Sequence, residues 1–159
     1  MSDSLNVMTL IQGELAISDD SSMVFSTLLG SCISVCLYDP YAGVGGMNHF
    51  LLPGMDCAGA ASTTTYLYGV NAMDELVRRL LNAGCMKERL ECKAFGGASV
   101  LSIASNIGQE NVAFLWRYLQ SKNLSCVAYS LGGHKVRRIR FWPTTGKVLQ
   151  YQCQPTSSV

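Results

Sequence analysis

The sequence predicts an α+β fold in which mixed sheets or a β-sandwich carry two main helices on the outside. About eight short apolar or alternating segments indicate strands. Two longer segments with apolar residues at helical spacing indicate helices. Strands and helices do not alternate strictly along the chain, which disfavours a doubly wound nucleotide-binding fold. With 159 residues, 48% of them hydrophobic, the chain is expected to form one domain over residues 1–159, ending in a loose tail at residues 155–159.

The strands are expected mainly at the two ends of the chain. Apolar and polar residues alternate from Ile33 to Tyr38, the pattern of a strand, and Asp39-Pro40 ends it. Gly43, Gly45 and Gly46 are expected to form a tight connection to the next strand. The expected strands and extended pieces, in order, are residues 7–11, 14–17, a strand starting at 23, then 33–38, 47–52, 90–95, 124–130, 136–142 and 147–152.

The two helices are expected at residues 66–82 and 109–122. Each has an apolar stripe at helical spacing, and Gly84 is a suitable stop for the first helix. The residues of the stripes are Val70, Met73, Val77, Leu80 and Leu81, then Val112, Leu115, Trp116 and Leu119.

The composition excludes several classes of protein. Twelve basic and 11 acidic residues give a net charge of +1, so no global charge favours nucleic acid or a membrane surface. The sequence contains neither an apolar run of about 20 residues nor a secretory signal, so we expect a cytoplasmic protein without membrane insertion. The seven cysteines form no CxxC motif and the two histidines have no ligand spacing, so we expect neither a metal nor a cofactor.

Cys32 and His49 are the candidate catalytic pair. Cys32 follows Gly30-Ser31, small residues that let the backbone approach a substrate closely. His49 comes one strand and one return later, so adjacent strands can bring thiol and imidazole together. A thiol with a neighbouring base is the basic requirement for nucleophilic attack on an acyl group. The simpler alternatives are a buried cysteine and a core histidine.

Two further features complete the candidate site. The backbone N–H groups of Ser31 and Cys32 are expected to stabilise the oxyanion that the attack creates. A third group should orient the imidazole, and Ser26 or Thr27 at the end of the preceding strand can do so with a hydroxyl.

Other polar residues are assigned to the surface. His134 lies in a turn and is expected to be exposed or to face the substrate, not to be catalytic. The basic segment KVRRIR at residues 135–140 is expected to be an edge strand protected by its charges. The alternative for this segment is docking to an acidic protein surface.

Several motifs together resemble the CheD family of chemoreceptor glutamine deamidases. They occur in the family's order over nearly the whole chain, and the pairing of Gly30-Ser31-Cys32 with Gly46-Met47-Asn48-His49 is specific. The matching pieces are Leu29-Gly30-Ser31-Cys32, Tyr38-Asp39-Pro40, Gly45-Gly46-Met47-Asn48-His49, Leu52-Pro53, Gly96-Gly97-Ala98-Ser99, Asn106-Ile107-Gly108 and Leu131-Gly132-Gly133.

The resemblance implies a protein-glutamine glutaminase that converts glutamines of methyl-accepting chemoreceptors to glutamate and ammonia. Cys32 is then the nucleophile and His49 the general base. Ser26 holds the position of the family's threonine, and Thr27 is the alternative. The implied fold is like that of the bacterial toxin-type cysteine deamidases. The loops that we expect to face the substrate carry Gly96, Gly97, Ser99, Gly132, Gly133 and His134.

The implied partners are the cytoplasmic helical region of the receptors and a CheC-type phosphatase of CheY-phosphate. The alternative function is a non-catalytic protein that binds receptors and regulates such a phosphatase. That role needs a surface and not a thiol, so the presence of both Cys32 and His49 favours catalysis. A thiol-redox protein is a more remote alternative.

Overall fold

Residues 4–52, 63–99 and 106–153 are described by the structure, a computed structural model. They form two sheets and two α-helices, which confirms the predicted mixed α+β class. The predicted loose tail at residues 155–159 lies outside these ranges. The elements are β1 (Asn6–Thr9), β2 (Leu15–Ser18), β3 (Met23–Leu29), β4 (Ile33–Asp39), β5 (Val44–Asn48), α1 (Thr63–Asn82), the 3-10 helix η1 (Lys87–Arg89), β6 (Glu91–Gly96), α2 (Ile107–Ser121), β7 (Ser125–Leu131), β8 (Val136–Phe141) and β9 (Val148–Cys153).

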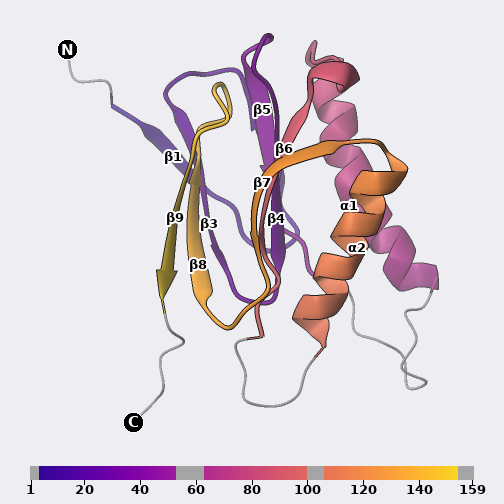
Figure 1. Cartoon of the computed structure of the whole chain (residues 1–159). Coiled ribbons are helices and arrows are strands. Elements are labelled where there is room, and N and C mark those ends of the chain that lie inside the picture. The colour runs from indigo at the N-terminus through magenta and orange to yellow at the C-terminus, as the bar shows by residue number, and fades with distance from the viewer. Residues whose placement is uncertain (1–3, 53–62, 100–105, 154–159) are drawn as a thin grey trace.

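These elements are stacked in three layers (Figure 1). A four-stranded sheet in the order β1-β3-β8-β9 packs on a five-stranded sheet in the order β2-β5-β4-β6-β7. Helices α1 and α2 cover the other face of the five-stranded sheet. The central strand β4 is therefore covered on both faces, and all seven of its residues are buried.

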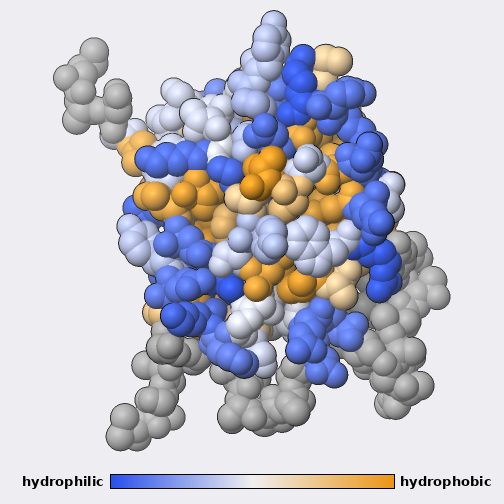
Figure 2. Space-filling view, viewed as in Figure 1, coloured by the Kyte–Doolittle hydropathy of each residue, from blue (hydrophilic) through white to orange (hydrophobic). Residues whose placement is uncertain are grey.

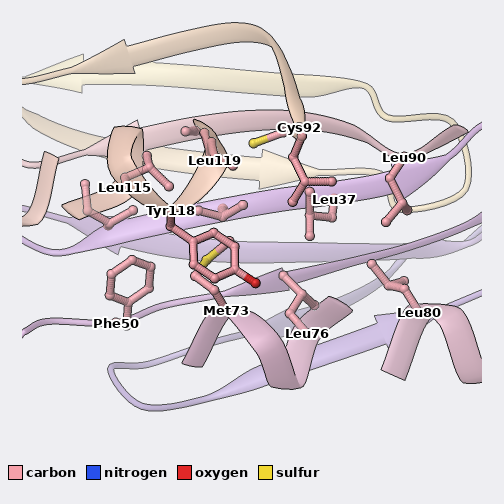
Figure 3. Packing of buried hydrophobic residues seen from close by; sticks show 14 of the residues in the cluster. Leu37, Phe50, Met73, Leu76, Leu80, Leu90, Cys92, Leu115, Tyr118 and Leu119 are labelled. Carbon is pink, nitrogen blue, oxygen red and sulfur yellow. The ribbon is translucent and has the colours of Figure 1, made fainter. Parts of the chain in front are cut away.

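Two hydrophobic cores separate the layers. The first lies between the sheets and includes Phe25, Leu29 and Phe141 of the four-stranded sheet. The second lies between the five-stranded sheet and the helices. Figure 3 shows side chains of both helices meeting those of the strands in this second core. Its members include Leu37, Phe50, Met73, Leu76, Leu80, Leu90, Cys92, Leu115, Tyr118 and Leu119. Burial of this apolar area is the main force that holds the layers together.

The strand that leads to His49 starts earlier than predicted. Gly45 and Gly46 were expected in a tight connection, yet both lie inside β5. A β-carbon on Gly45 would lie 2.2 Å from the Pro143 carbonyl oxygen, and one on Gly46 would lie 2.6 Å from Ile17. Neighbouring segments therefore approach β5 so closely that only glycine fits at these two positions.

The basic segment is not an edge strand. It forms β8, which lies between β3 and β9 in the four-stranded sheet. Arg138 and Arg140 point to the exposed outer face, whereas Arg137 points inward and is buried. The prediction was wrong because the pairing with β3, a strand remote in sequence, leaves no sign within the segment itself.

The surface of the molecule mixes both kinds of side chain. Figure 2 shows hydrophobic areas bordered by hydrophilic ones on the face that carries β9, β7 and α2. Tyr129 of β7 and Trp116 of α2 are exposed and stack edge to face, with ring centroids 5.0 Å apart. Among the described residues, no helix is long and apolar enough to cross a membrane.

Candidate active site

A short antiparallel pairing brings the segments of Cys32 and His49 together. Ile33 and Phe50 exchange two backbone hydrogen bonds, each 2.9 Å long. Both of these residues face the core beneath the helices. Because side chains alternate, Cys32 and His49 face the opposite side, toward the four-stranded sheet. They are diagonal neighbours across the pairing, a relation in which backbones lie roughly 7–8 Å apart and long side chains can meet.

Thr27 fixes the protonation of the His49 ring. Its hydroxyl donates its single proton to the Leu10 carbonyl oxygen at 2.7 Å. The same hydroxyl oxygen lies 2.7 Å from His49 Nδ1, so it must accept a hydrogen bond from an Nδ1–H group. In the neutral ring, the proton is therefore on Nδ1, and Nε2 carries the lone pair that can accept a proton.

Ser26 does not share this position. Alternation along β3 points Thr27 between the sheets together with Phe25 and Leu29, which belong to the core there. Ser26 points to the other face of the sheet, and its backbone pairs with Arg140. The preference for Ser26 as the orienting hydroxyl is thereby corrected, since the contact with the ring is made by Thr27.

Burial keeps both members of the pair uncharged at rest. Desolvation raises the pKa of the Cys32 thiol above its ordinary value of 9.0. Desolvation also lowers the pKa of His49 below 6.5, although the Leu10 carbonyl and the charge of Glu14 act in the opposite direction. At neutral pH the site therefore holds a thiol and a neutral imidazole, and the imidazole can act as a base.

The turn at Cys32 is fixed through its carbonyl groups. Within the described residues, the N–H groups of Ser31 and Cys32 donate to no acceptor. That these two groups form an oxyanion site stays a prediction. The carbonyl oxygens of Gly30, Ser31 and Cys32 accept hydrogen bonds from Ala98 N at 3.0 Å, Asn111 Nδ2 at 2.8 Å and Gly97 N at 2.9 Å, respectively.

Two glycines allow the end of β6 to approach the nucleophile. Gly96 and Gly97 have φ angles of 111° and 69°, in the left-handed region that favours glycine. A β-carbon on Gly96 would lie 2.0 Å from the carbonyl oxygen of Cys32. Glycine at position 96 is thus a requirement for the close packing of β6 against the Cys32 turn.

The loops that were predicted to face the substrate come together in the structure. Gly132 N donates to Gly96 O at 2.9 Å, and Ser99 N donates to Gly133 O at 2.8 Å. The exposed ring of His134 lies with Nδ1 3.0 Å from Ser99 O. These segments form one rim beside the Cys32 turn; that they contact the substrate stays a prediction.

Arg137 holds the rim from inside, a role that the sequence analysis missed. This buried side chain donates to the carbonyl oxygens of Gly96 at 3.1 Å and Gly132 at 2.8 Å, and to Ser130 Oγ at 3.0 Å. The available signal was its alternation with Ile139, which placed both side chains on one face of the strand.

The turn between β1 and β2 is a part of the site that was not predicted. Gly13 N donates to His49 O at 2.7 Å, and His49 N donates to Glu14 O at 3.0 Å. The side chain of Gln12 reaches the nucleophile, with the thiol of Cys32 donating to Gln12 Oε1 at 3.8 Å. The sequence indicated only a bend at Gly13, and no local pattern reveals these long-range contacts.

A cavity of about 260 Å³ opens beside His49 toward α1. Glu14 and His49 line one side of it, and Asn71 and Glu75 of α1 line the other. Solvent therefore reaches the segment that carries His49. Among the described residues, no group of three or more His, Cys, Asp or Glu side chains is placed to hold a metal ion.

Comparisons with known proteins point to one family. The family model described as CheD chemotactic sensory transduction matches residues 51–152. A relative from Rhizobium rhizogenes, named "Probable chemoreceptor glutamine deamidase CheD", is 44% identical over 142 residues, covering 89% of this chain and 77% of its own. A Cereibacter sphaeroides protein of the same name is 47% identical over 146 residues, covering 92% of this chain and 72% of its own.

Two solved structures of other proteins show a partial likeness. A Neisseria meningitidis protein of the DUF152 family aligns with a TM-score of 0.49 and 10% identity, covering 82% of this chain. The Bacillus licheniformis hypothetical protein YfiH aligns with a TM-score of 0.47 and 10% identity, covering 81% of this chain. The chain spans less than two thirds of either structure, 64% and 60% respectively.

Proposed function

The chain belongs to the CheD chemotaxis family, and from that premise we propose that it is a protein-glutamine deamidase acting on chemoreceptors as a single domain. The observation that carries the proposal is the hydrogen bond between Thr27 and His49 Nδ1. That bond leaves Nε2 free to act as a base on the same face of the sheet as the Cys32 thiol. The names of the relatives supply the substrate, a glutamine side chain of a chemoreceptor.

The first half of the reaction forms a thioester. His49 Nε2 accepts the thiol proton while Cys32 Sγ attacks the carboxamide carbon of the substrate. A C–S bond forms and the π electrons of the carbonyl move to its oxygen. The N–H groups of Ser31 and Cys32 stabilise this oxyanion. When the intermediate collapses, the C–N bond breaks, His49 returns the proton to nitrogen and ammonia leaves.

The second half releases glutamate. His49, neutral again, removes a proton from water as the water oxygen attacks the thioester carbon. The resulting oxyanion is held by the same two N–H groups, and its collapse breaks the C–S bond. The proton on His49 then returns to Cys32, so the enzyme regains its starting state.

The proposed partner is the cytoplasmic helical region of a methyl-accepting chemoreceptor, which would place the protein in the cytoplasm at receptor arrays. Support comes from the relatives' names, which specify chemoreceptors. A CheC-type phosphatase is a second proposed partner, and it rests on the family resemblance alone. Binding of such a phosphatase would use the surface of the protein and would survive the loss of the Cys32 thiol.

The proposal is tested with a purified chemoreceptor cytoplasmic fragment and three forms of the enzyme: wild type, Cys32→Ala and His49→Ala. Intact mass and peptide mapping detect each conversion of glutamine to glutamate. We expect conversion by wild type only, since each variant lacks one partner of the proton transfer. If wild type leaves the glutamines of several receptors intact but binds the fragments, the non-catalytic function replaces deamidation.

A further inference from the structure

Gln12 is the side chain from the turn between β1 and β2 that reaches the nucleophile. Its Oε1 lies 3.8 Å from Cys32 Sγ and accepts a hydrogen bond from the thiol. Gln12 is itself exposed, and Cys32 is half-buried. No step of the mechanism above uses this group.

The turn that carries Gln12 is closed on itself. Glu14 N donates to Ile11 O at 3.0 Å, and Ile11 N donates to the Glu14 side chain at 2.8 Å. Gly13 has a φ angle of 91°, which the turn requires and which glycine adopts without strain.

The same turn is attached to the base. Gly13 N donates to His49 O, and Glu14 O accepts from His49 N. The carbonyl oxygen of Leu10, the residue just before the turn, accepts a hydrogen bond from the Thr27 hydroxyl. The backbone of Gln12 is therefore held in register with His49 and Thr27, and its position beside Cys32 is built into the fold.

We propose that Gln12 is a further catalytic residue, which donates a side-chain N–H group to the oxyanion formed at Cys32. This inference rests on the proposed deamidase function. Glutamine side chains can serve as oxyanion donors, and a donor must lie about 2.7–3.1 Å from the oxyanion. The oxyanion lies one bond beyond the carbon that sulfur attacks, so a carboxamide 3.8 Å from Sγ is at a suitable distance.

The resting orientation of the carboxamide follows from the state of the sulfur. A thiol donates a hydrogen bond, so it pairs with the carbonyl oxygen Oε1. Once the sulfur has attacked, it carries no proton to donate, and negative charge develops on the substrate oxygen. Rotation about the terminal side-chain bond exchanges Oε1 for Nε2, because the two ends of a carboxamide have nearly the same shape. The amide N–H then points toward that charge.

The test compares Gln12→Met, which keeps the length of the side chain but has no N–H donor, with Gln12→Ala. Each is assayed for deamidation of a chemoreceptor fragment and for alkylation of Cys32 by iodoacetamide. Alkylation needs the nucleophile but forms no oxyanion. We expect kcat for deamidation to fall by about 10²–10³-fold in both variants, the usual effect of losing one oxyanion donor. The alkylation rate of Cys32 should stay at the wild-type value.

Ile11→Ala is the matched control, because the Ile11 side chain is 64% exposed in the same turn. It should leave both rates unchanged. The inference is overturned if Gln12→Met keeps the wild-type kcat or exceeds it, or if alkylation slows as much as deamidation does. Failure of wild type to deamidate any receptor fragment is a different result: it refutes the proposed function and this inference together.

Discussion

At the scale of single residues, two adjacent hydroxyls in β3 have opposite surroundings. Thr27 faces the space between the sheets and contacts the imidazole of His49. Ser26 is equally buried but lies on the other face of the strand. The difference arises because successive side chains along a strand point to opposite faces of the sheet. It does not depend on the chemical similarity of serine and threonine.

Thr27→Val should therefore impair catalysis, because valine keeps the shape of threonine but cannot hydrogen-bond to Nδ1. The imidazole then loses the group that fixes its tautomer. We expect kcat to fall by about tenfold or more, equivalent to the ~1.5 kcal/mol that a hydrogen bond to a charged group contributes. Steady-state deamidation assays measure this effect. Ser26→Ala is the control and should keep nearly full activity; an equal loss in both variants would contradict the assignment to Thr27.

The pH dependence follows from the two perturbed pKa values. Since burial lowers the pKa of His49, the neutral base persists until the pH falls through a value below 6.5. Since burial raises the pKa of Cys32, its thiolate appears only as the pH rises through a value above 9.0. Deamidation should therefore be nearly constant around neutral pH, and alkylation of Cys32 should keep rising beyond pH 9.0.

Peptide mapping is needed to follow that alkylation, because Cys126 is a second reactive candidate. A hydrogen bond from the thiol of Cys92 lowers the pKa of Cys126. We expect Cys126 to react before Cys32 near neutral pH, without loss of activity. Rapid alkylation of Cys32 at pH values below 6.5 would show a resting thiolate–imidazolium pair and would contradict a neutral site.

At the scale of the elements, the site depends on how the ends of β6, β7 and β8 are joined. Arg137 of β8 connects these strand ends through hydrogen bonds to Gly96, Ser130 and Gly132. Gly96 belongs to the segment that packs against the Cys32 turn. The guanidinium therefore connects the four-stranded sheet to the rim of the site.

Arg137→Leu should lower the free energy of unfolding by about 3 kcal/mol, because it removes the three hydrogen bonds that the buried guanidinium donates to Gly96, Ser130 and Gly132. Urea denaturation followed by fluorescence measures this change. Arg138→Leu is the matched control on the exposed face of β8, and it should change stability by less than about 0.5 kcal/mol. Equal effects in the two variants would show that the buried hydrogen bonds do not hold the rim.

At the scale of the whole molecule, the elements that leave a pattern in the local sequence were predictable. The alternation from Ile33 to Tyr38 indicated β4, and the apolar stripes indicated both helices. The Gly-Ser-Cys and Gly-Met-Asn-His motifs identified the candidate pair. The sequence also narrowed the orienting hydroxyl to Ser26 or Thr27, and the register of β3 was needed to decide between them.

The features that were missed depend on contacts between distant segments. Gly45 lies in a strand because β5 pairs with both β2 and β4, and Pro143 approaches it from another part of the chain. Arg137 is buried because its acceptors belong to two other strand ends. Gln12 reaches Cys32 because β1 and β2 join different sheets, which places the intervening turn over the site. Apart from the alternation of Arg137 with Ile139, no local sequence pattern indicates these contacts.

In the proposed mechanism a receptor glutamine acylates Cys32, and hydroxylamine can trap the resulting thioester. Wild type and Cys32→Ala are incubated with a chemoreceptor cytoplasmic fragment and hydroxylamine, and the fragment is mapped by mass spectrometry. We expect wild type to place a hydroxamate on the same glutamine that it otherwise converts to glutamate, and Cys32→Ala to produce neither product. Formation of glutamate without any hydroxamate, or conversion by Cys32→Ala, would contradict the thioester mechanism.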